Sequence, residues 1–165
     1  MKNHLETKKI LKALAGAVIA ALIFFITLPY IFIILGTMLE IPVFFSYTKA
    51  IAGIIMITAG ITIFFYCSYL FIKEGKGTPA PFEPTNKLVK NRIYKYTRNP
   101  MYIGYMLIIT GQFFLTGAVI LIVYALLIFS FIYWYVIFIE EPKLEKKFGK
   151  KYKEYKKKVP RWLLY

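Results

Sequence analysis

Apolar residues dominate this chain in four long runs that are separated by short polar segments. The runs extend roughly over residues 10–39, 43–72, 101–115 and 118–139. The first two exceed the ~20 residues that an α-helix needs to cross a bilayer. Because the hydrocarbon core offers no water to backbone polar groups, segments inside it must be helical. The pattern therefore predicts an all-α, polytopic membrane protein with about four transmembrane helices.

The last two runs form a short hairpin in this interpretation. Between Tyr102 and Glu140 lie 37 residues, with Thr116 and Gly117 as the only plausible turn. Division there predicts helices of about 14 and 22 residues, roughly 21 and 33 Å long. The first is too short for a full crossing unless the bilayer thins or the hairpin stops partway. Either way, the chain brings Glu140 and Glu141 back to the level of Arg98–Tyr102.

The positive charges support this topology. The net charge is +14, and 21 of the 22 Lys and Arg residues fall in residues 1–12, 73–98 and 143–161. With four crossings, these three segments lie on one face, which the positive-inside rule assigns to the cytoplasm. We therefore expect an integral membrane protein with cytoplasmic N- and C-termini, in the plasma membrane of a prokaryote. No nucleic-acid motif accompanies the charge, so we expect no nucleic-acid partner.

The length of 165 residues predicts one membrane domain, with two N-terminal transmembrane helices in residues 1–72 and the functional core in residues 73–165. The basic start before the long first run is typical of an uncleaved anchor. Cys67 and His4 are the only residues of their kinds, so we expect no metal site. Small residues of the first run predict a close helix contact; they are Ala13, Ala15, Ala17, Ala20 and Ala21.

Residues 86–102 are the one long polar passage between apolar runs, and we expect the functional site there. Pro100 suits the first turn of a helix and Asn99 suits its N-cap. That helix start, with Arg98 beside it, would favour an anionic ligand group. Glu140 and Glu141 would meet it, although two such carboxylates could also merely mark the membrane interface. Residues 75–84 contain three prolines, and they could form either a stiff linker or a strap over a cofactor.

Residues 142–158 predict one amphipathic helix. Its apolar residues recur at helical spacing and form a stripe flanked by lysines: Leu144, Phe148, Tyr152, Tyr155 and Val159. A basic amphipathic helix lies in the headgroup plane and attracts anionic lipid headgroups. We therefore expect anionic lipid as a partner of this segment.

Three motifs resemble those of the isoprenylcysteine carboxyl methyltransferase and phospholipid methyltransferase superfamily. They are R-N-P-M-Y-x-G from Arg98, E-E-P from Glu140, and F-G-x-x-Y-x-x-Y-x-x-x-V-P-R from Phe148. The L-V-x-x-x-x-Y stretch from Leu88 to Tyr94 matches as well. Each motif alone is weak, but their order and spacing make the combination fairly specific. The resemblance covers about half the chain, from Gly75 to the end.

The resemblance implies a membrane methyltransferase that binds S-adenosyl-L-methionine and acts on a lipid-like acceptor from the bilayer. The acceptor would be a prenylcysteine carboxylate or a lipid amine. By the same resemblance, the cofactor-binding residues are Asn86, Lys87, Leu88, Val89, Tyr94, Asn99, Pro100, Met101, Tyr102 and Glu140. We expect Arg98 and Glu141 to take part in catalysis. A carboxylate suits the ammonium of such a cofactor, amides or arginine suit its carboxylate, and aromatic rings suit the rest.

Two departures from the family pattern concern the acceptor. Asn99 and Val136 stand where the carboxyl methyltransferases have histidine and arginine. The arginine is associated with the prenylcysteine acceptor, so its absence weighs against carboxyl methylation. Two other functions stay open at this point: a non-enzymatic membrane adaptor that binds anionic lipid through its basic helix, and a reductase that shares the fold. The reductase is less favoured because the expected extra helices are missing.

Overall fold

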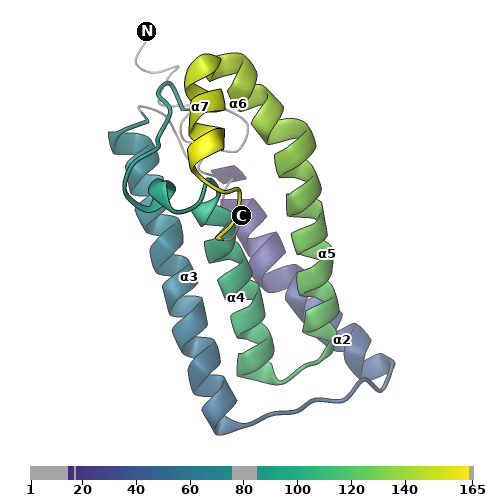
Figure 1. The fold of residues 1–165 in the computed structure, drawn as a ribbon. Helices are drawn as coiled ribbons and strands as arrows, with labels where there is room; N and C mark the ends of the chain where they lie inside the picture. The colour runs from purple at the N-terminus through teal and green to yellow at the C-terminus, as the bar shows by residue number, and fades with distance from the viewer. Residues whose placement is uncertain (1–14, 17, 76–84, 164–165) are drawn as a thin grey trace, which may run out of the picture.

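The computed structural model describes residues 15–16, 18–75 and 85–163 (Figure 1). This part of the chain is helical and contains no β-strand. The elements follow in the order η1 (Ile23–Thr27), α2 (Leu28–Met38), α3 (Tyr47–Lys73), η2 (Arg92–Lys95), α4 (Pro100–Thr116), α5 (Ile120–Tyr135), η3 (Val136–Glu140), α6 (Glu141–Phe148) and α7 (Lys150–Lys158). His4 and residues 76–84, and with them the choice between linker and strap, lie outside the described residues.

Three of the helices are long and apolar enough to cross a membrane. They extend over Val18–Met38, Tyr47–Lys73 and Ile120–Phe148, the last being α5, η3 and α6 in one continuous helix. The apolar α4 has 17 residues, about 25 Å at 1.5 Å per residue, and falls short of the ~30 Å hydrocarbon thickness. The all-helical membrane architecture is confirmed, whereas the count of four full crossings is not.

The α4–α5 hairpin has the predicted geometry. Pro100 is the first residue of α4, and Gly117 ends it in the left-handed conformation with φ of 73°. A side chain at Gly117 would also collide with the backbone of Phe44 at 2.6 Å, because the connection from α2 to α3 crosses here. In Figure 1 this connection and the hairpin turn lie at one end of the molecule, and the start of α4 lies at the other with α6 and α7.

Glycines allow α3 and α4 to pack almost backbone to backbone. A Cβ at Gly60 would lie 2.5 Å from the carbonyl oxygen of Gly104, and one at Gly53 would lie 2.6 Å from that of Gly111. Such small-residue seams bring membrane helices close together. The sequence prediction placed this kind of contact on the first helix instead. Among the alanines named for it, Ala15, Ala20 and Ala21 are exposed, while Ala13 and Ala17 lie outside the described residues.

The first spanning helix contains a π-helical turn, η1, which leaves backbone carbonyl groups free to accept other donors. Two polar side chains from the hairpin use them. Gln112 of α4 donates from Nε2 to the carbonyl oxygen of Phe25 at 2.6 Å, and the Tyr124 hydroxyl of α5 donates to that of Phe24. These bonds fasten the first helix to the hairpin inside the apolar part of the protein.

The prediction of a single amphipathic helix over residues 142–158 is wrong, because the structure has two helices there. Gly149, with φ of 55°, separates α6 from α7, and the chain reverses direction there (Figure 1). The predicted stripe does not face the bilayer either. Tyr152, Tyr155 and Val159 are buried together, with the other stripe residues and Leu88 packed against them. The two helices fold onto each other because each buries its apolar side against the other and the preceding loop.

Candidate functional site

A second π-helical turn, η3, comes directly before the two predicted carboxylates. Glu140 ends η3 and Glu141 begins α6, about 30 Å along the helix from Ile120, so both lie near the boundary of the hydrocarbon core. Adjacent residues of a helix point in directions about 100° apart. The two carboxylates therefore enter different surroundings.

Glu141 is the centre of a buried ion-pair cluster. Its side chain is 6% exposed, and Arg98 Nη1 lies 3.0 Å from its Oε1. Arg161 binds it with two hydrogen bonds, from Nε to Oε1 at 2.9 Å and from Nη2 to Oε2 at 3.1 Å. Lys156 Nζ adds a longer contact of 3.6 Å to Oε2. The hydrogen bonds to Glu141 raise the pKa of Arg161, so this pair stays ionised at physiological pH.

Glu140 faces tyrosines instead of cations. Its Oε2 accepts a hydrogen bond of 2.8 Å from the Tyr102 hydroxyl of α4. The Tyr102 ring meets that of Tyr105 edge-on, with centroids 5.8 Å apart. No lysine or arginine of residues 15–16, 18–75 and 85–163 lies within ion-pair distance of Glu140. This carboxylate therefore has room for a cationic group at ion-pair distance, a position that no described lysine or arginine fills.

Tyr94 lies at the same end of the molecule as Glu140, on the side of the protein interior. It is 4% exposed and packs in a buried cluster with Cys67, Leu70 and Val89. Burial raises the pKa of its hydroxyl, with further contributions from Cys67, Tyr155 and Glu140, so the group is neutral. Apart from the Cys67 thiol, this hydroxyl has no hydrogen-bond partner among the described residues. Tyr94 thus offers a hydroxyl close to Glu140 whose one hydrogen-bonding neighbour among the described polar groups is a thiol, which is a weak hydrogen-bonding group.

The start of α4 differs from the prediction in one respect. Asn99 occupies the N-cap position, but its side chain caps no backbone amide of the helix. Its Nδ2 instead donates to the carbonyl oxygen of Arg161 at 2.9 Å. The prediction of a local cap is wrong because the side-chain amide of Asn99 is oriented toward the C-terminal tail instead. The first-turn N–H groups of α4 are accordingly left without a side-chain cap.

The predicted cofactor-binding segment 86–89 is split between surface and core. Asn86 and Lys87 are exposed, and the backbone of Lys87 is tied to Gly75 by a hydrogen bond of 2.9 Å. Val89 is buried against α3, and Leu88 packs against the cluster formed by α6 and α7. Pro100 is buried and Met101 is half-buried beside Tyr94, so the structure brings part of the predicted set together at the start of α4.

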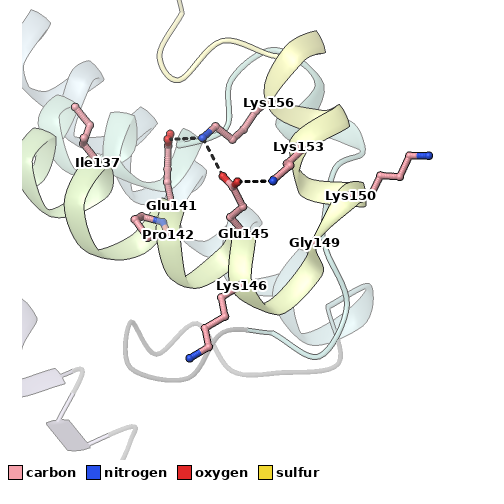
Figure 2. Close-up of a pocket in the computed structure, with 9 residues that line it drawn as sticks. All are labelled: Ile137, Glu141, Pro142, Glu145, Lys146, Gly149, Lys150, Lys153 and Lys156. Carbon is pink, nitrogen blue, oxygen red and sulfur yellow. Dashed lines mark hydrogen bonds and ion pairs between the residues drawn. The ribbon is translucent and has the colours of Figure 1, made fainter.

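An open groove of about 610 Å³ lies on another side, between α6 and α7 (Figure 2). Figure 2 shows a chain of ion pairs along it, in which Lys156 bridges Glu141 and Glu145 and Lys153 contacts Glu145. The side chains of Lys146 and Lys150 point away from this chain. Of the predicted site residues, Glu141 alone lines the groove. The predicted site and this groove are therefore different places, separated by the Glu141 cluster.

Sequence reasoning missed two residues that hold the site together. Arg161 binds Glu141, and the hydroxyl of Tyr155 donates to the backbone carbonyl of Tyr94 at 2.7 Å. Both belong to the C-terminal motif that starts at Phe148, so the signal was present in the sequence. The motif was interpreted as a surface helix, which hid its contacts with a segment some 60 positions earlier.

These features define a helical integral membrane protein with a polar site at one end of a short hairpin. The model of the phospholipid methyltransferase family matches residues 48–151, and the chain belongs to this family. The match covers both the glycine seam and the Glu140–Glu141 pair, and it confirms the resemblance stated from the motifs. Neither the curated proteins nor the solved structures include a match to the chain.

Proposed function

We propose that this protein transfers a methyl group from S-adenosyl-L-methionine to a lipid-like acceptor at the cytoplasmic end of its helices. Membership of a methyltransferase family supports methyl transfer in general. The observation that carries the proposal is the position of Glu140, a half-buried carboxylate that is hydrogen-bonded to Tyr102 and has no lysine or arginine within ion-pair distance among the described residues. A site built this way favours a small ligand that brings its own positive charge.

The residues around Glu140 suit the remaining parts of that cofactor. Glu140 would bind the ammonium. The uncapped first turn of α4 and Arg98, whose Nε has no hydrogen-bond partner among the described residues, would bind the carboxylate. Tyr94 and Tyr102 would form aromatic walls for the sulfonium and the adenosine. Asn86, Lys87, Leu88 and Val89 stay a prediction for the outer part of this site.

When bound, S-adenosyl-L-methionine supplies a methyl group on a positively charged sulfur atom. The protein's contribution is to hold both reactants in line and to exclude water, since methyl transfer needs orientation more than a proton donor or acceptor. Glu141, for which we predicted a catalytic role, we now assign to fixing Arg98 and the C-terminal tail, because its two oxygens are occupied by two arginines and a lysine.

The acceptor comes from the bilayer in this proposal, as a lipid amine or a prenylcysteine carboxylate. We place the end that carries Glu140 on the cytoplasmic side, because the described basic stretches, residues 87–98 and 143–161, lie at this end of the molecule (Figure 1). A non-enzymatic lipid adaptor is a weaker proposal. The adaptor function requires the apolar stripe of residues 144–159 to lie in the bilayer. In the structure, this stripe is buried within the protein.

The test is incubation of the purified protein with methyl-labelled S-adenosyl-L-methionine and total membrane extract. We expect label in the lipid fraction, released by base if the product is an ester and stable if it is an amine. Glu140→Gln should abolish labelling, whereas Glu154→Gln, a change on the exposed face of α7, should leave it intact. The absence of labelled lipid with a folded wild-type protein, or full labelling by a folded Glu140→Gln variant, would refute the proposal.

A further inference from the structure

The C-terminal tail crosses back over the start of α4 after α7 ends at Lys158 (Figure 1). Its backbone accepts three hydrogen bonds from one short segment. Arg98 N–H donates to the carbonyl oxygen of Pro160 at 3.0 Å, while Thr97 Oγ1 and Asn99 Nδ2 donate to that of Arg161 at 3.0 and 2.9 Å. Thr97 is 2% exposed and Asn99 8%, so these bonds are shielded from water and are costly to leave unmade.

The side chain of Arg161 extends in the other direction, to the end of the last spanning helix. Its two hydrogen bonds with Glu141 are the bidentate geometry that arginine makes with a carboxylate. Arg161 therefore contacts both parts of the site. Its carbonyl oxygen binds the segment before α4, and its guanidinium binds Glu141. Glu141 is adjacent to Glu140, so the same contact fixes where Glu140 lies relative to Tyr102.

The next residue anchors the tail to the apolar surface of α5. The Trp162 ring packs against Phe129 at 5.7 Å and Tyr133 at 6.5 Å between centroids, and the Arg161 guanidinium lies 5.9 Å from the Tyr133 ring. α4 and α5 also share an apolar core in which Ile109 of α4 meets Leu121 and Tyr124 of α5, and Figure 1 shows the two helices diverging toward the tail. The tail lies between the two helices here: it makes polar contacts with the start of α4 and aromatic contacts with α5.

We propose that Arg161 is a positioning residue, and that the tail from Val159 to Leu163 is a clamp that sets the separation between the start of α4 and the Glu140–Glu141 pair. The clamp rests on the proposed function, because its consequence is the shape of the site for the methyl donor. Arg161 does not touch the reacting atoms. It acts through Glu141 and through the backbone of residues 97–99.

The experiment compares Arg161→Ala and Arg161→Lys with Lys157→Ala, an exposed lysine of α7 that serves as the matched control for lost charge. We expect Arg161→Ala to raise the KM for S-adenosyl-L-methionine by about tenfold or more, since displacement of a positioned group by ~1 Å costs up to a hundredfold. The kcat at saturation should change by about twofold or less, since no reacting group is removed. Arg161→Lys should fall between the wild type and Arg161→Ala, because lysine keeps the charge and loses the paired geometry.

Hydrogen exchange of the full-length protein in detergent provides a readout that needs no activity. The amide of Arg98, protected by Pro160 in the wild type, should exchange at least about tenfold faster in Arg161→Ala and at the wild-type rate in Lys157→Ala. Unchanged exchange in Arg161→Ala would refute the clamp. Faster exchange with an unchanged KM would refute its positioning role. If the wild type itself fails to use the methyl donor, the proposed function falls, and the exchange data still decide whether the clamp exists.

Discussion

Glu140 and Glu141 are neighbours in the sequence, yet they lie in opposite kinds of surroundings. Glu141 is enclosed by Arg98, Arg161 and Lys156, whereas Glu140 meets the hydroxyl of Tyr102. A buried carboxylate whose charge is neutralised by the protein is part of the structure. The half-buried Glu140 has no lysine or arginine within ion-pair distance among the described residues, so in our proposal its charge is available to a ligand. In our proposal these two glutamates have different roles: Glu141 holds the site together, and Glu140 binds the ligand.

The largest effect that we expect is on stability, from Glu141→Gln. The change leaves the buried Arg98 and the half-buried Arg161 without the carboxylate that neutralises both. Breaking a buried pair by removing one partner costs about 3–5 kcal/mol. Thermal and denaturant unfolding in detergent measure this loss. A variant as stable as the wild type would show that the Glu141 cluster does not hold the site together.

Glu140→Gln should produce the opposite result. Glutamine can still accept the hydrogen bond from Tyr102, so the free energy of unfolding should change by less than about 1 kcal/mol. Affinity for S-adenosyl-L-methionine should fall at least about thirtyfold, because loss of one partner from a buried charge pair costs ~2 kcal/mol or more. Equilibrium dialysis with labelled cofactor gives the affinity, and Glu154→Gln is the control. Loss of stability without loss of affinity would reverse the roles of the two glutamates.

Tyr102→Phe sharpens the Glu140 side of the comparison. It removes the hydrogen bond of 2.8 Å from Tyr102 that orients the Glu140 carboxylate, and it keeps the aromatic ring. We expect about fivefold weaker cofactor binding, which corresponds to ~1 kcal/mol for one hydrogen bond. The same dialysis measures it. Wild-type affinity in this variant would mean that the Tyr102 hydroxyl does not orient Glu140.

Lys156→Ala should have the smallest effect of the four. Its ammonium lies 3.6 Å from Glu141 and its side chain is 33% exposed, so water replaces much of the contact. Partly exposed ion pairs contribute about 0.5 kcal/mol. Unfolding measurements should therefore barely separate this variant from the wild type. A loss as large as that of Glu141→Gln would place the main partner of Glu141 on α7 instead of in Arg98 and Arg161.

Local features of the sequence predicted most of the frame. Runs of apolar residues located the helices to within a few positions, Pro100 marked the start of α4, and Thr116 with Gly117 marked the hairpin turn. These signals depend on backbone chemistry within one or two turns, so they can be recognised without knowledge of the fold. The convergence of Glu140 with Tyr102 followed from helix lengths alone.

The misses involve contacts between distant segments. Gly53 and Gly60 match Gly104 and Gly111 only once α3 and α4 are aligned, so the seam between them was not found. The apolar stripe of α6 and α7 has the spacing of a membrane-surface helix. Gly149 breaks the helix, and the stripe then packs within the protein, with Leu88 against it. Asn99 has the right position for a cap but binds the carbonyl oxygen of Arg161. Periodicity shows that a face is apolar, but it does not show what covers that face.

The most direct test of this division of roles is the unfolding temperature of Glu140→Gln and Glu141→Gln, each measured in detergent with and without saturating S-adenosyl-L-methionine. A ligand present at about 100 times its Kd stabilises the protein by ~2.7 kcal/mol. We predict that Glu140→Gln keeps the ligand-free value and loses most of the ligand-induced rise, while Glu141→Gln lowers the ligand-free value and keeps a larger share of the rise. The same pattern in both variants, or the reverse assignment, would contradict the account.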